Sequence, residues 1–249
     1  MMLSRTSLCL GYVDRARLHR DEALAEARRL SPNTLAFALG EAWYGDWAIE
    51  GVKSAPMMLR SATEVLAISN RQGFPLALGI GKIMRGWCLG AAGRSEEGLP
   101  LLLEGIEMRR ATGANLLIPF YLIALAEAYG MAAQPEEGLD RLAEAAKLIE
   151  TTQERWIEPE IHRLRGTLLL SMHEQTEAED SYRHALAVAQ EQSAKFWELR
   201  AALDLARLWR DQGKHNKARN LLAPIYDWFT EGFDTPFLQD AKTLLGQLA

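Results

Sequence analysis

The sequence predicts an all-α protein, an α-α superhelix (solenoid) built from antiparallel helix pairs that repeat about every 40 residues. The main observation is that small residues recur at this interval in two series, the second twelve residues after the first. The first series is Gly86, Ala126, Gly166 and Ala206, and the second is Gly98, Gly138, Ala178 and Ala218. A fixed period of this length is the sequence signature of a repeat array. In such an array each unit buries its core against its neighbours and leaves a continuous surface for binding.

Close helix packing explains why these positions are small. Helix axes in proteins lie about 8–10 Å apart, and a glycine or alanine at the crossing point allows the closer end of that range. A bulky residue follows each member of the second series by four positions, where it can fill the space beside the crossing. These residues are Leu102, Leu142, Tyr182 and Leu222. The two series therefore predict where the helices of each pair touch.

Turn and capping residues predict the ends of the helices. In the clearest unit the two helices are expected over 115–132 and 135–151. Pro135 suits the first position of the second helix, because its missing N–H would be unpaired there. In the preceding unit we expect Gly93 to end the first helix in a left-handed conformation and Ser95 to cap the second. The turns are short, so the two helices of a unit must pack against each other.

The 40-residue interval divides the chain, which we expect to form a single domain over 1–249, into successive units. The expected divisions are a partial first unit at 1–30, an irregular unit at 31–72, regular units at 73–113, 114–153, 154–193 and 194–232, and a capping helix at 233–249. We expect Thr235 to cap this last helix and Pro236 to open it. Arrays need such a helix to cover the apolar face of the last unit.

The first two units are less regular than the rest. A good second helix at 13–30 is preceded by a short segment, so we expect the chain to begin inside a unit and to be the distal part of a longer array. Between Gly40 and Pro56 three glycines, three acidic residues and two tryptophans break the helical periodicity. Here we expect a helix over 33–43, an irregular stretch, and a further helix over 57–70.

Composition and charge narrow the class of protein. The 249 residues are 48% hydrophobic and 24% charged, as in ordinary globular proteins, and the net charge is −5. A duplex nucleic-acid binder usually carries a basic stripe, so we expect no nucleic-acid partner. Cys9 and Cys88 are too few for a disulfide framework, which favours a cytoplasmic location. The first residues do not have the apolar core of a signal peptide.

One apolar stretch invites comparison with a membrane span. Residues 116–133 contain Glu127 as their one charged residue. A transmembrane helix needs about 20 predominantly apolar residues. The glutamate, Pro119 and the position of this stretch in the 40-residue pattern favour instead a helix buried on most sides inside the array. We therefore expect no membrane partner.

No motif in the chain predicts catalysis, a cofactor or a metal site. Gly79-Ile80-Gly81 begins like a dinucleotide-binding loop, but Met84 stands in the third glycine position and no strand precedes it. A Gly-x-x-x-x-Gly-Lys phosphate loop does not occur, and the five histidines lack cysteine or carboxylate partners at metal-ligand spacing. Because an active site needs a convergent nucleophile, base or metal, we expect a protein that is not an enzyme.

Charged residues on the inner face form the candidate binding site. In arrays of this kind the first helices of the units line the concave groove. In the last two units these helices carry Glu160, Arg163, Arg200, Asp204, Arg207 and Arg210. Arginine suits the recognition of carboxylates or phosphates, but a solvated helix face explains the same residues. Arg85 and Arg165 stand where the pattern has leucine, and we expect carboxylate partners for them because an unpaired buried arginine would be costly.

Beyond the generic repeat, the chain resembles a known family. The small-residue series, with a bulky residue at plus four and a small one at plus seven, are similar to the tetratricopeptide pattern, whose usual unit is about 34 residues. Residues 73–248 also resemble the C-terminal repeat region of bacterial multidomain proteins that join a class III adenylate or guanylate cyclase domain to an AAA-type ATPase domain. The strings that carry this resemblance are QGFPLALG (72–79), RGWCLGAAGR (85–94), AYGMAAQPEEGL (128–139), ERWIEPEIHRLRGTLLL (154–170), WELRAALDLARLWRDQGK (197–214) and APIYDWFTEGFDTPFLQDAKTLL (223–245). The catalytic domains of that family lie upstream of this region, so no catalytic residue is carried over.

The array and the resemblance together predict a role in binding. We expect a non-catalytic regulatory or scaffolding segment of a signalling protein, which binds a protein partner, binds the upstream cyclase or ATPase domains, or associates with itself. The physical basis is a preformed concave surface, whose recognition costs little ordering entropy. The alternative is a sensor domain that holds a small-molecule effector in the concave groove.

Overall fold

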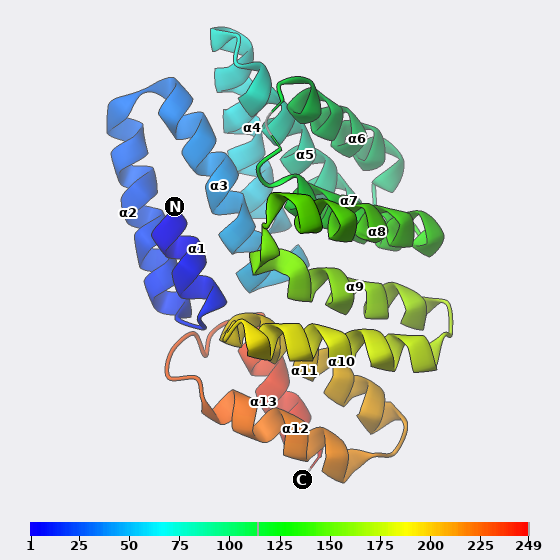
Figure 1. The fold of residues 1–249 in the computed structure, drawn as a ribbon. Helices are drawn as coiled ribbons and strands as arrows, with labels where there is room; N and C mark the ends of the chain where they lie inside the picture. The colour runs from blue at the N-terminus through cyan, green and yellow to red at the C-terminus, as the bar shows by residue number, and fades with distance from the viewer. Residues whose placement is uncertain (114, 249) are drawn as a thin grey trace.

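The computed structural model describes residues 1–113 and 115–248, and the regular elements in these two ranges are all helical. Successive helices pack as antiparallel pairs, which confirms the predicted α-α repeat solenoid (Figure 1). The α-helices are α1 (Met2–Cys9), α2 (Val13–Leu30), α3 (Pro32–Glu50), α4 (Ala55–Gln72), α5 (Pro75–Ala91), α6 (Ser95–Ala111), α7 (Ile118–Met131), α8 (Pro135–Thr152), α9 (Glu158–Ser171), α10 (Gln175–Glu191), α11 (Lys195–Asp211), α12 (His215–Asp227) and α13 (Pro236–Gln247). Two short 3-10 helices, η1 (Gly51–Ser54) and η2 (Arg155–Ile157), lie between them.

The small residues lie where paired helices touch. A methyl group at Gly86 on α5 would come within 2.6 Å of the carbonyl oxygen of Gly98 on α6. At Gly105 it would lie 2.6 Å from the carbonyl oxygen of Gly79. Helices α5 and α6 therefore meet backbone to backbone at two points, which only glycine permits. In the pair α9–α10 the same position, Gly166, faces the ring of a tyrosine instead.

Left-handed residues repeat the 40-residue period in the turns. Within the helix pairs they are Gly93, Ala133, His173 and Gly213, with φ between 57° and 75°. Between the pairs they are Gly73, Gly113, Gln153 and Ser193, with φ between 53° and 76°. This conformation favours glycine, yet four of the eight residues are not glycine. The packing of the helices therefore fixes the turn geometry even where the local sequence does not prefer it.

Two expected helix ends are shifted. Gly93 follows α5 as predicted, but Ser95 is the first residue of α6 and not its cap; Arg94 precedes the helix. Helix α7 begins at Ile118 and not at residue 115, because Leu117 has a left-handed φ of 66°.

Helix α3 corrects the expectation of an irregular unit at 31–72. The expected end near Trp43 is wrong, because α3 continues to Glu50 and η1 leads directly into α4. Every residue from 42 to 49 is buried. A helix that is buried on all sides has no polar face, so its sequence shows no helical periodicity. The stretch looked irregular because it lies in the middle of the protein.

Aromatic side chains of α3 fill the interior of the superhelix. They pack against rings from α7, η2 and α11, which are far away in the sequence. The pairs Trp43–Phe120, Tyr44–Trp156 and Trp47–Trp197 have ring centroids 4.8, 4.7 and 6.5 Å apart. The ring pairs have tilted or edge-on geometries, which aromatic side chains prefer over face-to-face stacking. Helix α3 therefore belongs to the array, and its aromatic side chains also occupy the space on the concave side.

Glu127, the one charged residue of the apolar stretch around α7, is hydrogen-bonded to two tryptophans. Glu127 accepts hydrogen bonds from the indole N–H groups of Trp47 on α3 and Trp87 on α5, each at 2.7 Å. Within the described residues no helix has the length and apolar content needed to cross a bilayer. Helix α7 itself has 14 residues. The apolar sequence of α7 is therefore explained by its burial against α3, α5 and α8.

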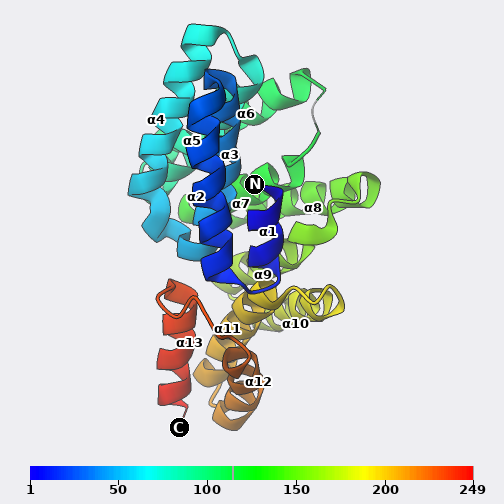
Figure 2. The ribbon, with the colours of Figure 1, turned by 90° about the vertical axis from the view of Figure 1, so that its left-hand side faces the viewer.

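The two ends of the chain meet: the segment that joins α12 to α13 lies against α2 and the turn before it, and α1 contacts α11 (Figures 1 and 2). The ring of Trp228 lies over Gly11, where an added Cβ would be 2.7 Å from it. Glu231 accepts hydrogen bonds from the N–H groups of Asp14 and Arg15 at 3.0 and 3.2 Å, so a residue near the C-terminus caps the first turn of α2. These contacts join segments more than 200 residues apart.

The last helix covers the end of the array, as expected. Helix α13 begins at Pro236 and packs on α11, α12 and α3. Thr235 takes the capping position, but its hydroxyl group is buried and does not hydrogen-bond to the helix. Leu238, Ala241 and Leu244 are the buried residues of its inner face.

We predict that Gly86→Ala destabilises the protein by about 1–3 kcal/mol, because the new methyl group would force α5 and α6 apart. Gly90→Ala in the same helix is the matched control. Its methyl group would have an ordinary contact of 3.7 Å with Ala128, so the higher helix propensity of alanine should leave stability unchanged or raised by up to about 1 kcal/mol. Urea unfolding measures both, and equal effects would contradict the close crossing.

Candidate functional site

The predicted inner-face residues are joined by ion pairs between α9 and α11. Glu160, Arg163 and Arg200 are 0%, 8% and 4% exposed. Arg163 donates from Nε to Glu160 at 2.9 Å and from Nη1 to Asp204 at 2.7 Å. Nη2 of Arg200 lies 3.2 Å from the other oxygen of Glu160. The structure therefore brings these four residues together, with three of them buried.

The two remaining predicted residues lie at the edge of this network. Arg207 donates to Asp204 at 3.0 Å and to Asp240 on α13 at 2.6 Å. Arg210 lies further out and donates to Gln247, also on α13, at 3.1 Å and to Asp211 at 2.8 Å. Both side chains are partly exposed. The six residues thus link α9, α11 and α13 to one another.

Arg200 has the most central position of the six. Its guanidinium carbon lies 5.1, 5.4 and 4.4 Å from the ring centroids of Trp47, Trp197 and Phe237. Its Nη1 donates to the carbonyl oxygen of Ala48 at 3.1 Å. A cation held over aromatic faces in a desolvated site is attracted by about 2 kcal/mol or more. Arg200 therefore ties α3 to α11 and α13 from inside the superhelix.

Burial perturbs the charges of this interior. It lowers the pKa of Arg200, and Glu160 only partly offsets that effect. Burial also acts to lower the pKa of Arg163, but its two carboxylate partners outweigh it and the pKa is raised. Asp46 on α3 has its pKa raised to about 6 by burial, against the opposing effect of Arg20. Arg163, Arg200 and Glu160 hold one another in place, whereas Asp46 is held by Arg20.

Arg85 and Arg165 differ in their partners: Arg85 acts electrostatically on Glu97 and helps to lower the pKa of that carboxyl, whereas Arg165 has no such neighbour among its hydrogen-bond partners. Both side chains are exposed, so no burial penalty requires a carboxylate partner. Arg165 donates instead to the hydroxyl group of Ser181 at 3.2 Å. The expectation of a carboxylate partner is therefore wrong for Arg165.

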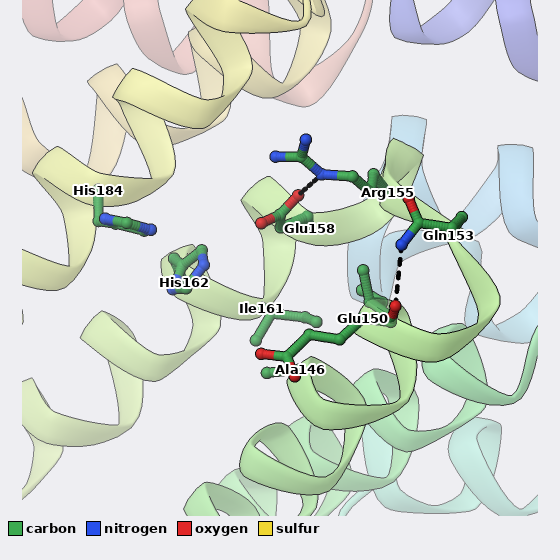
Figure 3. Close-up of a pocket in the computed structure, with 9 residues that line it drawn as sticks. Ala146, Glu150, Gln153, Arg155, Glu158, Ile161, His162 and His184 are labelled. Atoms are coloured by element: carbon green, nitrogen blue, oxygen red, sulfur yellow. Dashed lines mark hydrogen bonds and ion pairs between the residues drawn. The ribbon is translucent and has the colours of Figure 1, made fainter.

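An open cleft of about 490 Å³ lies between α8, α9 and α10 (Figure 3). Its lining residues are Ala146, Ile149 and Glu150 from α8, Gln153 and Arg155 from the following turn, Glu158, Ile161 and His162 from α9, and His184 from α10. The floor is apolar and the rim is polar. This combination, a cavity with a few convergent polar groups, is typical of a binding site.

The turn from α8 to α9 shapes one wall of the cleft. Gln153 ends α8 with a left-handed φ of 60°, and its side-chain amide donates to the carbonyl oxygen of Glu150 at 2.8 Å (Figure 3). Arg155 donates from Nε to Glu158 at 2.8 Å. The side chain of Gln192 donates to the carbonyl oxygen of Arg155 at 3.0 Å. This wall is therefore fixed by hydrogen bonds before any ligand arrives.

Two histidines from neighbouring helices meet at the other wall. The ring centroids of His162 and His184 are 4.1 Å apart, in an edge-to-face arrangement (Figure 3). Burial, followed by the effect of His184, lowers the pKa of His162 to about 4. His162 is therefore neutral at pH 7 and can both donate and accept a hydrogen bond. The sequence placed the two histidines on different helices and gave no signal that they touch.

The polar side chains that line the cleft can donate and accept hydrogen bonds and form ion pairs. Its lining residues include carboxylates, an amide, a guanidinium group and imidazoles, but no serine, cysteine, threonine or lysine nucleophile. Across residues 1–113 and 115–248, no three histidine, cysteine or carboxylate side chains are grouped so that they could hold a metal ion. No protein-family model matches the chain, and no curated protein matches it significantly. The arguments about function therefore depend on the residues of this chain.

We predict that Glu160→Gln destabilises the protein by about 3–5 kcal/mol, because two buried arginines lose the carboxylate that compensates their charge. Arg207→Ala is the comparison, and it should cost about 1 kcal/mol or less since its ion pairs are partly exposed. Urea unfolding of the two variants separates these outcomes. A small effect of Glu160→Gln would show that the interior is open to water.

The lowered pKa of His162 predicts a pH dependence of stability. The unfolded chain takes up this proton near pH 6.5, whereas the folded protein resists it until about pH 4. Stability should therefore fall as the pH decreases through this window, and His162→Gln should remove that part of the fall. NMR titration of the His162 ring and melting temperatures of both proteins between pH 7 and about pH 4 measure this. A His162 titration midpoint near 6.5 would contradict the buried, neutral imidazole.

Proposed function

We propose that this chain is a non-catalytic protein-binding segment, which holds its partner in the cleft between α8, α9 and α10 and not on the concave face. The observation that carries this proposal is the contrast between the two surfaces. The concave side is filled by α3, and its charged residues are joined to one another. The outer cleft is open, has a hydrogen-bonded wall and offers polar groups above an apolar floor.

The resemblance in sequence suggests which partner to test first. The strings within 72–245 are similar to the C-terminal repeat region of bacterial cyclase–ATPase signalling proteins. In this proposal the chain is a tetratricopeptide-like segment of such a protein in the cytoplasm, and it docks the cyclase or ATPase domains. Stacked antiparallel helix pairs with a 40-residue period support this assignment, because stacked pairs of this kind bind through extended surfaces.

The alternative from the sequence, a small-molecule sensor with its ligand in the concave groove, has less support. A ligand there would have to displace side chains of α3, among them Trp43 and Trp47, which are each 1% exposed. Such an opening would expose a large aromatic core to water. Protein binding at the outer cleft needs no rearrangement of this kind, so it is the function that the geometry favours.

The test is complex formation between this chain and the cyclase–ATPase portion of a protein of the family that it resembles. We expect a complex in size-exclusion chromatography with light scattering. Glu150→Lys in the cleft should weaken it at least tenfold, which is about 1.4 kcal/mol. Glu22→Lys on the exposed face of α2, a charge reversal far from the cleft, is the matched control and should bind like the wild type.

Three outcomes of these measurements would contradict the docking proposal or change the partner. If the chain stays monomeric and binds neither domain, the docking role is wrong. A rise in melting temperature with nucleotides, sugars or phosphorylated metabolites, without any protein complex, would favour the sensor instead. Self-association by light scattering, lost in Glu150→Lys, would identify a second copy of the chain as the partner.

A further inference from the structure

Two clefts occupy equivalent places in successive repeats. One is the cleft already described between α8, α9 and α10. The other, of about 470 Å³, lies between α6, α7 and α8. Four residues of the latter, Arg110, Asn115, Ile118 and Glu144, stand 40 residues before four residues of the former, Glu150, Arg155, Glu158 and His184. The same four positions of the repeat therefore line both clefts, and their side chains can be compared directly.

In the cleft between α6 and α8 the chain supplies its own cation. Arg110 on α6 pairs with Glu144 on α8, and Glu144 also accepts from Arg141 at 2.8 Å. A similar bridge, Arg28 to Glu64 at 3.3 Å, crosses a cleft of about 330 Å³ between α2 and α4. In both clefts, therefore, an arginine on the second helix of one pair forms an ion pair with a glutamate on the second helix of the following pair.

In the cleft between α8 and α10 this cation is absent. Glu150 stands at the position of Arg110, and His184 stands at the position of Glu144. Among the residues that the structure describes, the carboxylate of Glu150 has no ion-pair partner, although it lines the cleft. The ring of His184 contacts His162 instead. The repeat therefore keeps the shape of the cleft and replaces its arginine with a carboxylate.

The charges and the floor of this cleft both fit a basic side chain. The one guanidinium group in the lining, that of Arg155, is already held by Glu158 at 2.8 Å and lies 3.8 Å from Glu191. Glu150 is therefore left as an uncompensated negative charge. The floor residues Ile149 and Ile161 are apolar, and a long basic side chain can lay its methylene groups on such a floor while its charged end reaches a carboxylate.

We infer that the cleft between α8, α9 and α10 receives an arginine or lysine side chain of the protein partner. The charged end of that side chain pairs with Glu150 and takes the role that Arg110 has one repeat earlier. The inference rests on the proposed function and adds to it the chemistry of the partner: a basic residue presented on its surface. Arg110 shows, within the same chain, that a guanidinium group fits the equivalent place.

The first experiment uses small probes and the histidine rings as reporters. The ring signals of His162 and His184 are followed by NMR as blocked arginine (N-acetyl-arginine methylamide) is added. Blocked norleucine is the uncharged control probe of similar length. We expect a saturating change with arginine only, and at least a tenfold loss of affinity in Glu150→Gln. Glu136→Gln, at the exposed start of α8, should bind arginine like the wild type.

The second experiment closes the cleft by design. Glu150→Arg together with His184→Glu places the Arg110–Glu144 pair in the later repeat. The melting temperature should stay at or above that of the wild type, whereas arginine binding, read from His162, should be lost because the chain's own guanidinium group fills the cleft. Equal responses to arginine and norleucine, no saturating change with arginine, or unchanged arginine affinity in the folded double variant would overturn the inference.

The docking function and the basic-residue inference can be tested separately, because different results contradict them. If the cyclase–ATPase portion binds the wild type and the closed-cleft variant equally well, the basic-residue inference is wrong and the docking function stands. If arginine binds at the cleft in a Glu150-dependent manner but no domain forms a complex, the cleft is a basic-residue site and the partner named under the proposed function is wrong.

Discussion

Burial of the second half of α3, residues 42–49, is the constraint on which the rest of this structure depends. In an open solenoid the first helix of a unit packs against its neighbours and shows one face to a groove. Here the face that would line the groove carries Trp43, Tyr44 and Trp47, and these rings must be covered. Distant helices supply the cover, and their own polar groups must then be satisfied inside: Glu127 accepts from two indoles, and Arg200 sits over aromatic rings. The need to bury these three rings therefore accounts for both the contacts across the superhelix and the ion pairs inside it.

The sequence predicted the fold class through local and periodic signals. The spacing of Gly86 and Gly98 identified a helix crossing because glycine at that point has one physical reason, the contact of two backbones. The second half of α3, beyond the expected end near Trp43, was missed for the opposite reason: a helical segment without a polar face carries no periodic signal. The turn after residue 132 was predicted, but the left-handed conformation of Ala133 and His173 was not, since these residues do not prefer it.

For the candidate site, the sequence predicted which charged residues lie together but not whether they are exposed to solvent. The charged residues of α9 and α11 were identified as a group, and Glu160, Arg163, Arg200 and Asp204 do lie together. Whether they face solvent depends on a contact between Arg200 and α3 that spans 152 residues, and no spacing rule reveals such a contact. The outer cleft depends likewise on how α8, α9 and α10 are placed against one another.

Contacts of the segment between α12 and α13 with α2 and the turn before it give this array a folding behaviour unlike that of a linear one. In an open array each unit contacts only its neighbours, so the ends fray and stability adds up unit by unit. Here Glu231 caps α2 across 217 residues and Trp228 lies over Gly11, so loss of the last helices would also uncap the second helix. Unfolding should then be cooperative over the whole chain. Refolding should be slow for a helical protein, because the ends must find each other before these contacts stabilise anything.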